Sequence, residues 1–481
     1  MNYRNALKVT TLSQVVTFVL SLLSVVVVSR LLTPAEIGVF SVSVSLLGFA
    51  HIFREFGVGQ YLVQAPSVGR TEFRAAFSVA LGCSWLVALL VALLAYPLSR
   101  LYGHEGVLQV LLLASLNFVA MPFGTPSLSM LRRELQFTRI AWLNIAGAVV
   151  QAIVTVGAAF MDQSYLSMAW GSLAMQLCKV MLLQIWRPGE VWMWPSTQGI
   201  RNVLRFGGLA TGASTAGSLG QAAPDLILGK TLGFADVAYL SRGMSLTSMV
   251  VEKVQEVVRS VFFPIYSNQL RDGASAPAKY LEAASNLVAI TAPLLVLLAI
   301  VADPLIPWMF GDQWLISAPL ASVICIAHLV SAPFAISGAA LTAAGAVGTL
   351  ARVEVTVSLF KVLLLTSSFW FDLQVVVFFI AAGYIVEAGL AYSGLRASIG
   401  LRLSALVTGL WRSYAMAAVT GLGALTVQRM AEPMFAHAPA PRLLELVVVC
   451  GAGFVCWVAA MWLFVHPLRQ EAARLMGWRH A

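Results

Sequence analysis

Charged residues are scarce in this chain of 481 residues. Asp, Glu, Lys and Arg together make up only 11% of it, whereas hydrophobic residues make up 59%. A typical soluble domain is about 25% charged. Because a soluble protein of this size could not bury so much apolar surface in its own core, the shortage of charge predicts that lipid surrounds much of the chain.

Cysteine and histidine are also few, and neither is spaced as a ligand set. The five cysteines all lie within apolar stretches and form no Cys-x-x-Cys pair: Cys83, Cys178, Cys325, Cys450 and Cys456. We interpret them as small hydrophobic residues rather than as disulfides. The six histidines show no zinc-binding spacing. The sequence therefore predicts neither a metal site nor a cofactor.

Catalytic and nucleotide-binding motifs are missing as well. The stretch Leu228-Gly229-Lys230-Thr231 resembles the end of a phosphate-binding loop, but Pro224 stands where that motif needs its first glycine. We find no arrangement typical of a catalytic triad. Membrane enzymes that act on lipid-linked sugars need a large external loop, and the longest outer loops predicted here have only about fifteen residues. The sequence therefore predicts a protein that is not an enzyme.

The net charge is +9, but the basic residues are dispersed. They lie mostly in short gaps between apolar stretches, and no basic patch is interleaved with aromatic residues. This pattern argues against a nucleic-acid partner and favours residues that set membrane topology. If the N-terminus is cytoplasmic, about twenty basic residues fall on the cytoplasmic side and about five on the other. We therefore expect both termini in the cytoplasm.

Long apolar stretches account for most of the sequence. A window of about 20 residues finds about fourteen spans. They cover approximately 9–32, 37–62, 74–97, 108–129, 140–161, 165–186, 206–231, 236–262, 283–302, 318–342, 352–371, 373–395, 405–427 and 443–465. The first is too long for a signal peptide, so we interpret it as a retained helix. The predicted fold is an all-α polytopic membrane protein.

An internal repeat organises these spans. The phrase at 30–41 returns at 230–241, with a base, Leu, Ala, an acid, a β-branched residue and Ser at matching positions. The stretch 95–98 is echoed at 302–305. The repeat contains six spans, an even number, so both copies have the same orientation in the membrane.

The repeat predicts the domain organisation. Its parts are an N-terminal six-helix bundle, a parallel C-terminal six-helix bundle, and two further helices with a basic tail, at residues 1–190, 191–400 and 401–481. We expect a cleft between the bundles, and transport by alternating access as one bundle rocks against the other.

Two motifs carry a family resemblance. The stretch Ser29–Gly38 and its continuation Arg54–Gly59 resemble the polysaccharide transport family, which shares a superfamily with multidrug-and-toxin extruders and the lipid II flippase. The resemblance covers nearly the whole chain and is strongest over the first 70 residues. It implies a Wzx-type flippase that carries undecaprenyl-diphosphate-linked oligosaccharide across the bacterial inner membrane, for lipopolysaccharide or exopolysaccharide.

The resemblance has further implications. A proton or sodium gradient would supply the energy, and the partners would be membrane lipids, a polysaccharide polymerase and glycosyltransferases. A multidrug-type ion-coupled exporter of the same superfamily is the alternative function. A non-transporting scaffold of an envelope assembly complex is a third interpretation.

Ionisable residues inside spans need a reason to be there, because each costs about 2.5–3.5 kcal/mol on insertion scales. Asp225 and Arg242 lie at similar depth in consecutive spans, so we predict an ion pair. Lys361 and Glu387 form a second predicted pair near mid-membrane. Each pair either serves transport or simply locks two helices together. Lys179 is a further lysine within a span.

Charges also gather near the predicted cytoplasmic mouth. Glu252, Lys253 and Glu256 lie near the cytoplasmic end of the eighth span, and Arg54 and Glu55 lie at the corresponding depth in the second. They are either solvated helix ends or a site for an anionic headgroup, in which Arg54 and Lys253 receive a diphosphate.

These interpretations define the predicted site. The substrate-binding set comprises four basic residues: Arg54, Arg242, Lys253 and Lys361. The set for ion coupling or structural pairing comprises five acidic residues: Glu55, Asp225, Glu252, Glu256 and Glu387.

Overall fold

A computed structural model describes residues 3–55, 57–436 and 441–466. Side chains are described throughout these ranges except at 3–8, 49, 51–55, 202, 208–221, 249–261, 264, 431–436 and 441. Within the described ranges the chain forms helices and turns, with no strand. Contacts divide it into two compact units, unit 1 at Met1–Ala238 and unit 2 at Tyr239–Ala481.

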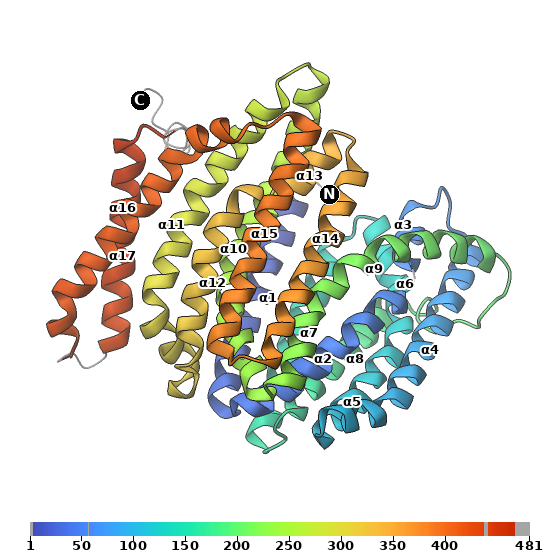
Figure 1. Cartoon of the computed structure of the whole chain (residues 1–481). Helices are drawn as coiled ribbons and strands as arrows, with labels where there is room; N and C mark the ends of the chain where they lie inside the picture. The colour runs from blue at the N-terminus through green and yellow to red at the C-terminus, as the bar shows by residue number, and fades with distance from the viewer. Residues whose placement is uncertain (1–2, 56, 437–440, 467–481) are drawn as a thin grey trace. The chain divides into compact units, whose positions relative to one another are not determined.

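Unit 1 contains the first ten helical segments and the start of the next helix (Figure 1). They are α1 (Tyr3–Leu31), α2 (Pro34–Glu55), α3 (Val58–Gln64), α4 (Arg70–Tyr102), α5 (Glu105–Ala120), η1 (Met121–Phe123), α6 (Thr125–Arg133), α7 (Phe137–Phe160), α8 (Leu166–Trp186), α9 (Ile200–Thr231) and the first turn of α10 (Phe234–Arg271). Helix α7 packs against both α1 and α8, and α9 packs against α2, α3 and α4.

Unit 2 contains the rest of α10 and the segments that follow it. They are α11 (Ala276–Phe310), η2 (Asp312–Trp314), α12 (Ser317–Ser331), η3 (Ala332–Phe334), α13 (Ser337–Ala343), α14 (Val347–Leu365), η4 (Thr366–Phe369), α15 (Leu373–Ile399), α16 (Leu403–Ala436) and α17 (Pro441–Leu463). Helix α15 packs against α12 and α14.

The repeated phrase is the start of a helix. The carboxylate of Glu36 accepts hydrogen bonds from both the backbone N–H and the hydroxyl of Thr33, each at 2.7 Å, and Pro34 begins α2. This is a capping box, with proline at the first helical position, where no backbone donor is lost. The second copy of the phrase begins α10 at Phe234, just after Gly233, whose φ is 110°.

The two copies of this phrase touch each other within unit 1. A Cβ placed on Gly38 would lie 1.8 Å from the carbonyl oxygen of Phe234. Only glycine allows the backbones of α2 and α10 to approach so closely. Gly38 thus has a packing role that explains its place in the motif.

A proline breaks the same span in each half. Helix α5 gives way to η1 at Met121-Pro122-Phe123, and α12 gives way to η3 at Ala332-Pro333-Phe334. Proline lacks a backbone donor and clashes with the preceding turn, so it bends a helix at this point. Matching kinks agree with a duplicated six-helix plan.

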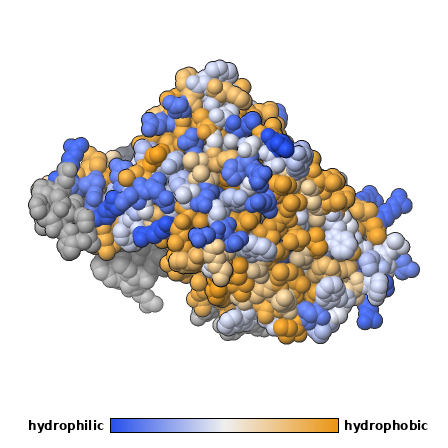
Figure 2. All heavy atoms as spheres, turned by 90° about the horizontal axis from the view of Figure 1, so that it is seen from below, coloured by the Kyte–Doolittle hydropathy of each residue, from blue (hydrophilic) through white to orange (hydrophobic). Residues whose placement is uncertain are grey.

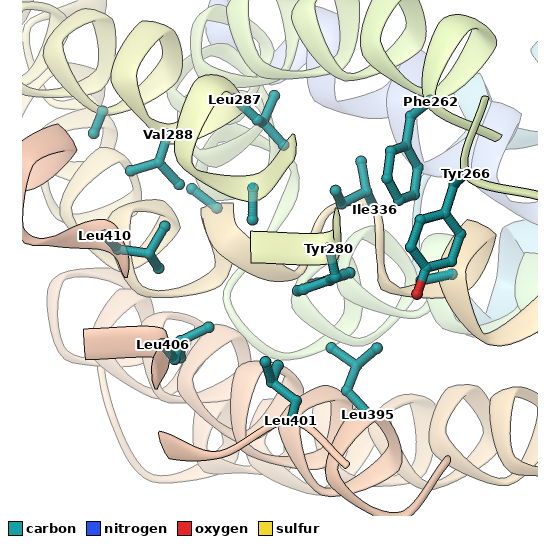
Figure 3. Close-up of a cluster of buried hydrophobic side chains, with 14 of the residues drawn as sticks. Phe262, Tyr266, Tyr280, Leu287, Val288, Ile336, Leu395, Leu401, Leu406 and Leu410 are labelled. Carbon is teal, nitrogen blue, oxygen red and sulfur yellow. The ribbon is translucent and has the colours of Figure 1, made fainter. Parts of the chain in front are cut away.

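The two C-terminal helices belong to the core of unit 2. Helices α16 and α17 pack against each other and against α11. Leu406 and Leu410 of α16 join a buried cluster with Tyr280 and Leu287 of α11 (Figure 3). Tyr280 is fully buried, and its hydroxyl donates to the carbonyl of Pro333 at 2.7 Å. This hydrogen bond ties α11 to the kink in the fourth span of the repeat.

Helix length and surface both fit a bilayer. Nine helices or kinked helix pairs within the described residues are long and apolar enough to cross a membrane. The fourteen stretches predicted from sequence overlap helical segments, with 37–62 covering both α2 and α3, and their number as membrane crossings stays a prediction. Large apolar side chains face outward, such as Leu93, Trp142 and Ile185, and hydrophobic residues cover much of the face in Figure 2. The chain is a multi-pass helical membrane protein.

The contact at Gly38 is testable. Replacing Gly38 with Ala should lower stability by about 1–3 kcal/mol through overpacking, although alanine is the better helix former by about 1 kcal/mol. The measurement is the thermal unfolding midpoint of the detergent-solubilised protein. Gly82→Ala is the matched control, because a Cβ at Gly82 meets nothing within 4 Å. Equal midpoints for the two variants would contradict the close approach.

Candidate functional site

The clearest charge pair within the spans that the sequence predicts lies in unit 2. The ammonium of Lys361 in α14 lies 2.5 Å from the carboxylate of Glu387 in α15. About a third of each side chain is exposed. The ion pair that the sequence predicts is therefore present, and its role in transport stays a prediction.

Two aromatic rings extend this pair toward a third helix. The Lys361 ammonium lies 4.9 Å from the ring centroid of Tyr384, and that ring lies 4.2 Å from the ring of His328 in α12. Lysine charge is attracted to the negative face of an aromatic ring. The resulting cluster of Lys361, Glu387, Tyr384 and His328 joins α12, α14 and α15 and concentrates titratable groups within the spans.

Asp225 is held in unit 1. Its carboxylate accepts a hydrogen bond from the hydroxyl of Ser45 in α2 at 2.7 Å. Nearby, the hydroxyl of Tyr102 donates to the carbonyl of Leu226 at 3.0 Å, and Lys230 donates to the carbonyl of Leu101 at 2.6 Å. The C-terminal part of α9 is thus anchored on α2 and α4, although the repeat assigns α9 to the second half of the sequence.

Arg242 lies in an aromatic environment in unit 2. Its side chain is 9% exposed, and its guanidinium carbon lies 5.6 Å from the ring centroid of Phe310 and 5.3 Å from that of Trp314. Among the described residues, its Nε has no hydrogen-bond partner. Because Asp225 belongs to unit 1 and Arg242 to unit 2, the predicted ion pair between them stays a prediction.

The charges predicted at the cytoplasmic mouth cannot be placed in the same way. Their backbones lie in the last turn of α2 and in the middle of α10. The side chains of Arg54, Glu55, Glu252, Lys253 and Glu256 lie outside the described residues. Their proposed contact with a headgroup stays a prediction.

Other basic residues of unit 1 hold the fold together. Arg133 donates from α6 to the carbonyls of Leu62 at 2.8 Å and Pro66 at 3.1 Å, at the end of α3. Arg187 forms ion pairs with Glu134 and with Glu190, the latter at 2.8 Å. Burial disfavours the charge of Arg187, but the hydrogen bonds and charges of Glu134 and Glu190 outweigh it and raise the pKa of Arg187. These arginines are structural.

Metal-binding groups are missing from the described part of the chain. None of its His, Cys, Asp and Glu side chains gathers in a group of three or more that could hold a metal ion.

Some contacts of the site could not be predicted from the sequence. The spacing of Lys361 and Glu387 in adjacent spans predicts their contact, because both lie near mid-membrane. The approach of His328 and Tyr384 depends on the rotation of α12 and α15, which depth alone does not give. The hydrogen bonds of Arg133 could not be predicted from the sequence either, because their acceptors are backbone carbonyls, which every residue type provides.

Comparison with known proteins finds similarity to proteins of polysaccharide biosynthesis. Residues 27–319, more than half of the chain, match the family model described as polysaccharide biosynthesis protein. The teichuronic acid biosynthesis protein TuaB of Bacillus subtilis strain 168 is 22% identical over 443 residues, which cover 89% of this chain and 88% of TuaB.

Other relatives match over a shorter length. The lipopolysaccharide biosynthesis protein WzxC of Escherichia coli strain K12 is 21% identical over 65% of this chain and 64% of WzxC. The succinoglycan biosynthesis transport protein ExoT of Rhizobium meliloti strain 1021 is 23% identical over 67% of this chain and 65% of ExoT. The chain therefore aligns with just under two thirds of the length of each of these two relatives.

Solved structures share the fold. The lipid II flippase MurJ in an inward closed conformation matches with a TM-score of 0.75 at 12% identity, over 95% of this chain and 99% of MurJ. An inward-facing multidrug resistance MATE family transporter of the MOP superfamily matches with a TM-score of 0.62 at 15% identity, over 82% of this chain and 96% of the transporter. The predicted all-α polytopic fold is confirmed.

The ion pair of Lys361 and Glu387 yields a stability prediction. Lys361→Glu would place two carboxylates together, and Glu387→Lys two ammonium groups, so each should destabilise the protein by roughly 1–3 kcal/mol. The double variant restores opposite charges and should recover most of the thermal midpoint measured in detergent. If the double variant instead loses the sum of the stabilities that the two single variants lose, direct pairing of Lys361 with Glu387 is contradicted.

The double variant also separates structure from transport. If it regains the midpoint but does not restore the phenotype of a strain that lacks the gene, the pair has a role beyond stability. If it regains both, the pair only locks α14 to α15.

Proposed function

Because this chain belongs to the polysaccharide biosynthesis protein family, we propose that it is a flippase that translocates undecaprenyl-diphosphate-linked oligosaccharide across the bacterial inner membrane. It is a membrane transport protein rather than an enzyme, like the relatives and solved structures that it resembles. The observation that carries the proposal is the combination of this family membership with the fold of a lipid flippase.

The chemistry of such a substrate sets the requirements for its carrier. A diphosphate cannot cross hydrocarbon unaccompanied, because burying an unpaired charge costs far more than thermal energy. The attached sugar adds many hydroxyl groups that need hydrogen-bond partners. The protein must therefore offer a hydrated passage with cations, while the polyprenyl tail stays in the bilayer.

The predicted site residues take roles in this scheme. Arg54 and Lys253 receive the diphosphate at the cytoplasmic mouth, and Arg242 and Lys361 supply further positive charge along the passage. Arginine binds phosphate oxygens through its planar fork, so Arg54 and Arg242 are well suited to this task. The described contacts support a task for Arg242, whose buried Nε has no hydrogen-bond partner.

Transport proceeds by alternating access in this proposal. The substrate enters from the inner leaflet, and movement of one six-helix bundle against the other exposes it on the far side. A proton or sodium gradient supplies the energy, with Asp225 and Glu387 as coupling residues and Glu55, Glu252 and Glu256 as further acidic groups. Both termini face the cytoplasm, in accordance with the distribution of basic residues.

Partners follow from the place of the substrate in envelope synthesis. Glycosyltransferases build the lipid-linked oligosaccharide on the cytoplasmic side, and a polymerase uses it on the other side. The chain would work between these two activities.

Deletion of the gene tests the proposed function. We expect loss of a surface polysaccharide and accumulation of its lipid-linked precursor on the cytoplasmic side, since the precursor cannot cross without a carrier. The measurement is the amount of surface polysaccharide, together with mass spectrometry of extracted polyprenyl lipids. Complementation with the wild-type gene is the control.

Two outcomes would contradict the proposal. Normal surface polysaccharide with altered drug sensitivity would identify a multidrug-type exporter instead. Loss of polysaccharide without any lipid-linked precursor would place the defect before translocation.

A further inference from the structure

The linker between the two predicted bundles is built into unit 1. It covers residues 187–199, between α8 and α9. Val191 is fully buried in a cluster with Leu131, Leu143 and Leu183, which belong to α6, α7 and α8. The linker is therefore a packed part of unit 1, although its sequence is a polar gap between apolar stretches.

Two contacts set the depth of this linker. The backbone N–H of Ser196 donates to the hydroxyl of Ser78 in α4 at 2.7 Å, and the ring of Trp192 lies 4.5 Å from that of Phe123 in η1. Ser78 and Phe123 both lie within stretches that the sequence predicts to span the membrane. Ser78 is four residues inside the stretch 74–97, which is about 6 Å along a helix. The linker thus runs beside the ends of these spans rather than beyond them.

Two tryptophans of this packed segment are exposed. The side chain of Trp192 is 65% exposed and that of Trp194 is 86% exposed. The carbonyl of Trp194 accepts a hydrogen bond from Arg74 at 3.1 Å, which holds its backbone on α4. Exposed tryptophans at the ends of membrane spans are typical of the boundary between headgroups and acyl chains, where the ring leaves water and its N–H stays hydrated.

A leucine on the adjacent turn is exposed as well, and its backbone is strained. Leu135 lies between α6 and α7, beside Glu134, whose carboxylate pairs with Arg187 at the start of the linker. The φ of Leu135 is 56°, and its side chain is 64% exposed. The left-handed region costs a residue with a Cβ about 1–2 kcal/mol. An exposed leucine in water does not offset this cost, whereas insertion into lipid removes its apolar surface from water.

The second copy of the repeat has glycine at the corresponding turn. Gly345 has φ 74° and lies two residues before α14, just as Leu135 lies two residues before α7. In each turn the next backbone N–H donates to the carbonyl four residues before the left-handed residue, at 2.9 Å in unit 1 and 2.8 Å in unit 2. The two turns have the same geometry, so unit 1 has a strained, exposed leucine where unit 2 has the residue that adopts this conformation without strain.

We propose that Leu135, Trp192 and Trp194 form an interface anchor, which inserts into the boundary between headgroups and acyl chains of the lipid leaflet at the predicted cytoplasmic end of unit 1. The partner of this surface is the lipid bilayer itself. The anchor holds the connection between the two predicted bundles at a fixed depth, so this connection stays in the interface during transport. The inference is independent of the substrate that the protein carries.

Fluorine NMR of the full-length protein in phosphatidylcholine nanodiscs tests the anchor. The tryptophans carry 5-fluorotryptophan, and Trp192→Phe and Trp194→Phe each remove one resonance and so assign it. Two paramagnetic agents are compared, a phosphatidylcholine with a nitroxide next to the headgroup and a gadolinium chelate dissolved in water. We expect both resonances to lose most of their intensity with the spin-labelled lipid and to keep most of it with the chelate. Leu135→Trp adds one resonance, which should show the same pattern.

The matched control is Asp272→Trp. Asp272 is exposed, in the turn between α10 and α11. It lies ten residues after the predicted stretch 236–262 and eleven before 283–302, which is about 15 Å along a helix. A tryptophan there lies in water and should lose its resonance to the chelate and not to the lipid. Thermal midpoints establish that each variant is folded.

The comparison of the two agents decides the proposal. A larger loss with the spin-labelled lipid than with the chelate at Trp192 and Trp194 supports the anchor. Equal losses with the two agents, or the pattern of Asp272→Trp, would overturn it and leave the proposed function intact.

Discussion

The cost of unpaired charge in hydrocarbon is the constraint on which this structure depends. Water screens a charge at low cost, but a bilayer does not, so each ionisable group within a span must be paired, engaged by polar groups or placed for a ligand. Lys361 with Glu387 shows the first solution, and Asp225 with Ser45 shows the second.

Duplication supplies the framework on which these charges are placed. The two repeats share a helix start and a proline kink in the fourth span. The charges placed on this framework differ between the units: Lys361 of unit 2 is paired with Glu387, whereas Asp225 of unit 1 accepts a hydrogen bond from Ser45.

Helix α9 shows that a repeat and a packing unit need not coincide. By sequence it opens the second copy, yet its C-terminal part is bonded to α2 and α4 of unit 1. In sequence, α9 thus opens the second predicted half, but its contacts place it in unit 1. Glycines are frequent in its middle, and small residues permit both close packing and bending in membrane helices.

Much of the fold could be predicted from the sequence because a bilayer requires each helical crossing to be a long apolar segment. Hydrophobic length places helices: the span that the sequence predicts from about residue 37 overlaps α2, which begins at Pro34. Depth arguments place Lys361 beside Glu387, since residues at one level of adjacent helices meet. They could not predict the ring contact between His328 and Tyr384, which depends on helix rotation, or the division at Ala238, which depends on tertiary contacts.

The central claim is that this protein moves a diphosphate-linked saccharide through the membrane. The most direct measurement uses liposomes that contain undecaprenyl-diphosphate-linked oligosaccharide, with a membrane-impermeant glycosidase outside. The account predicts that purified protein raises the cleaved fraction above the outer-leaflet share seen in protein-free liposomes. A cleaved fraction equal to that share, with folded protein in the bilayer and an ion gradient applied, would contradict it.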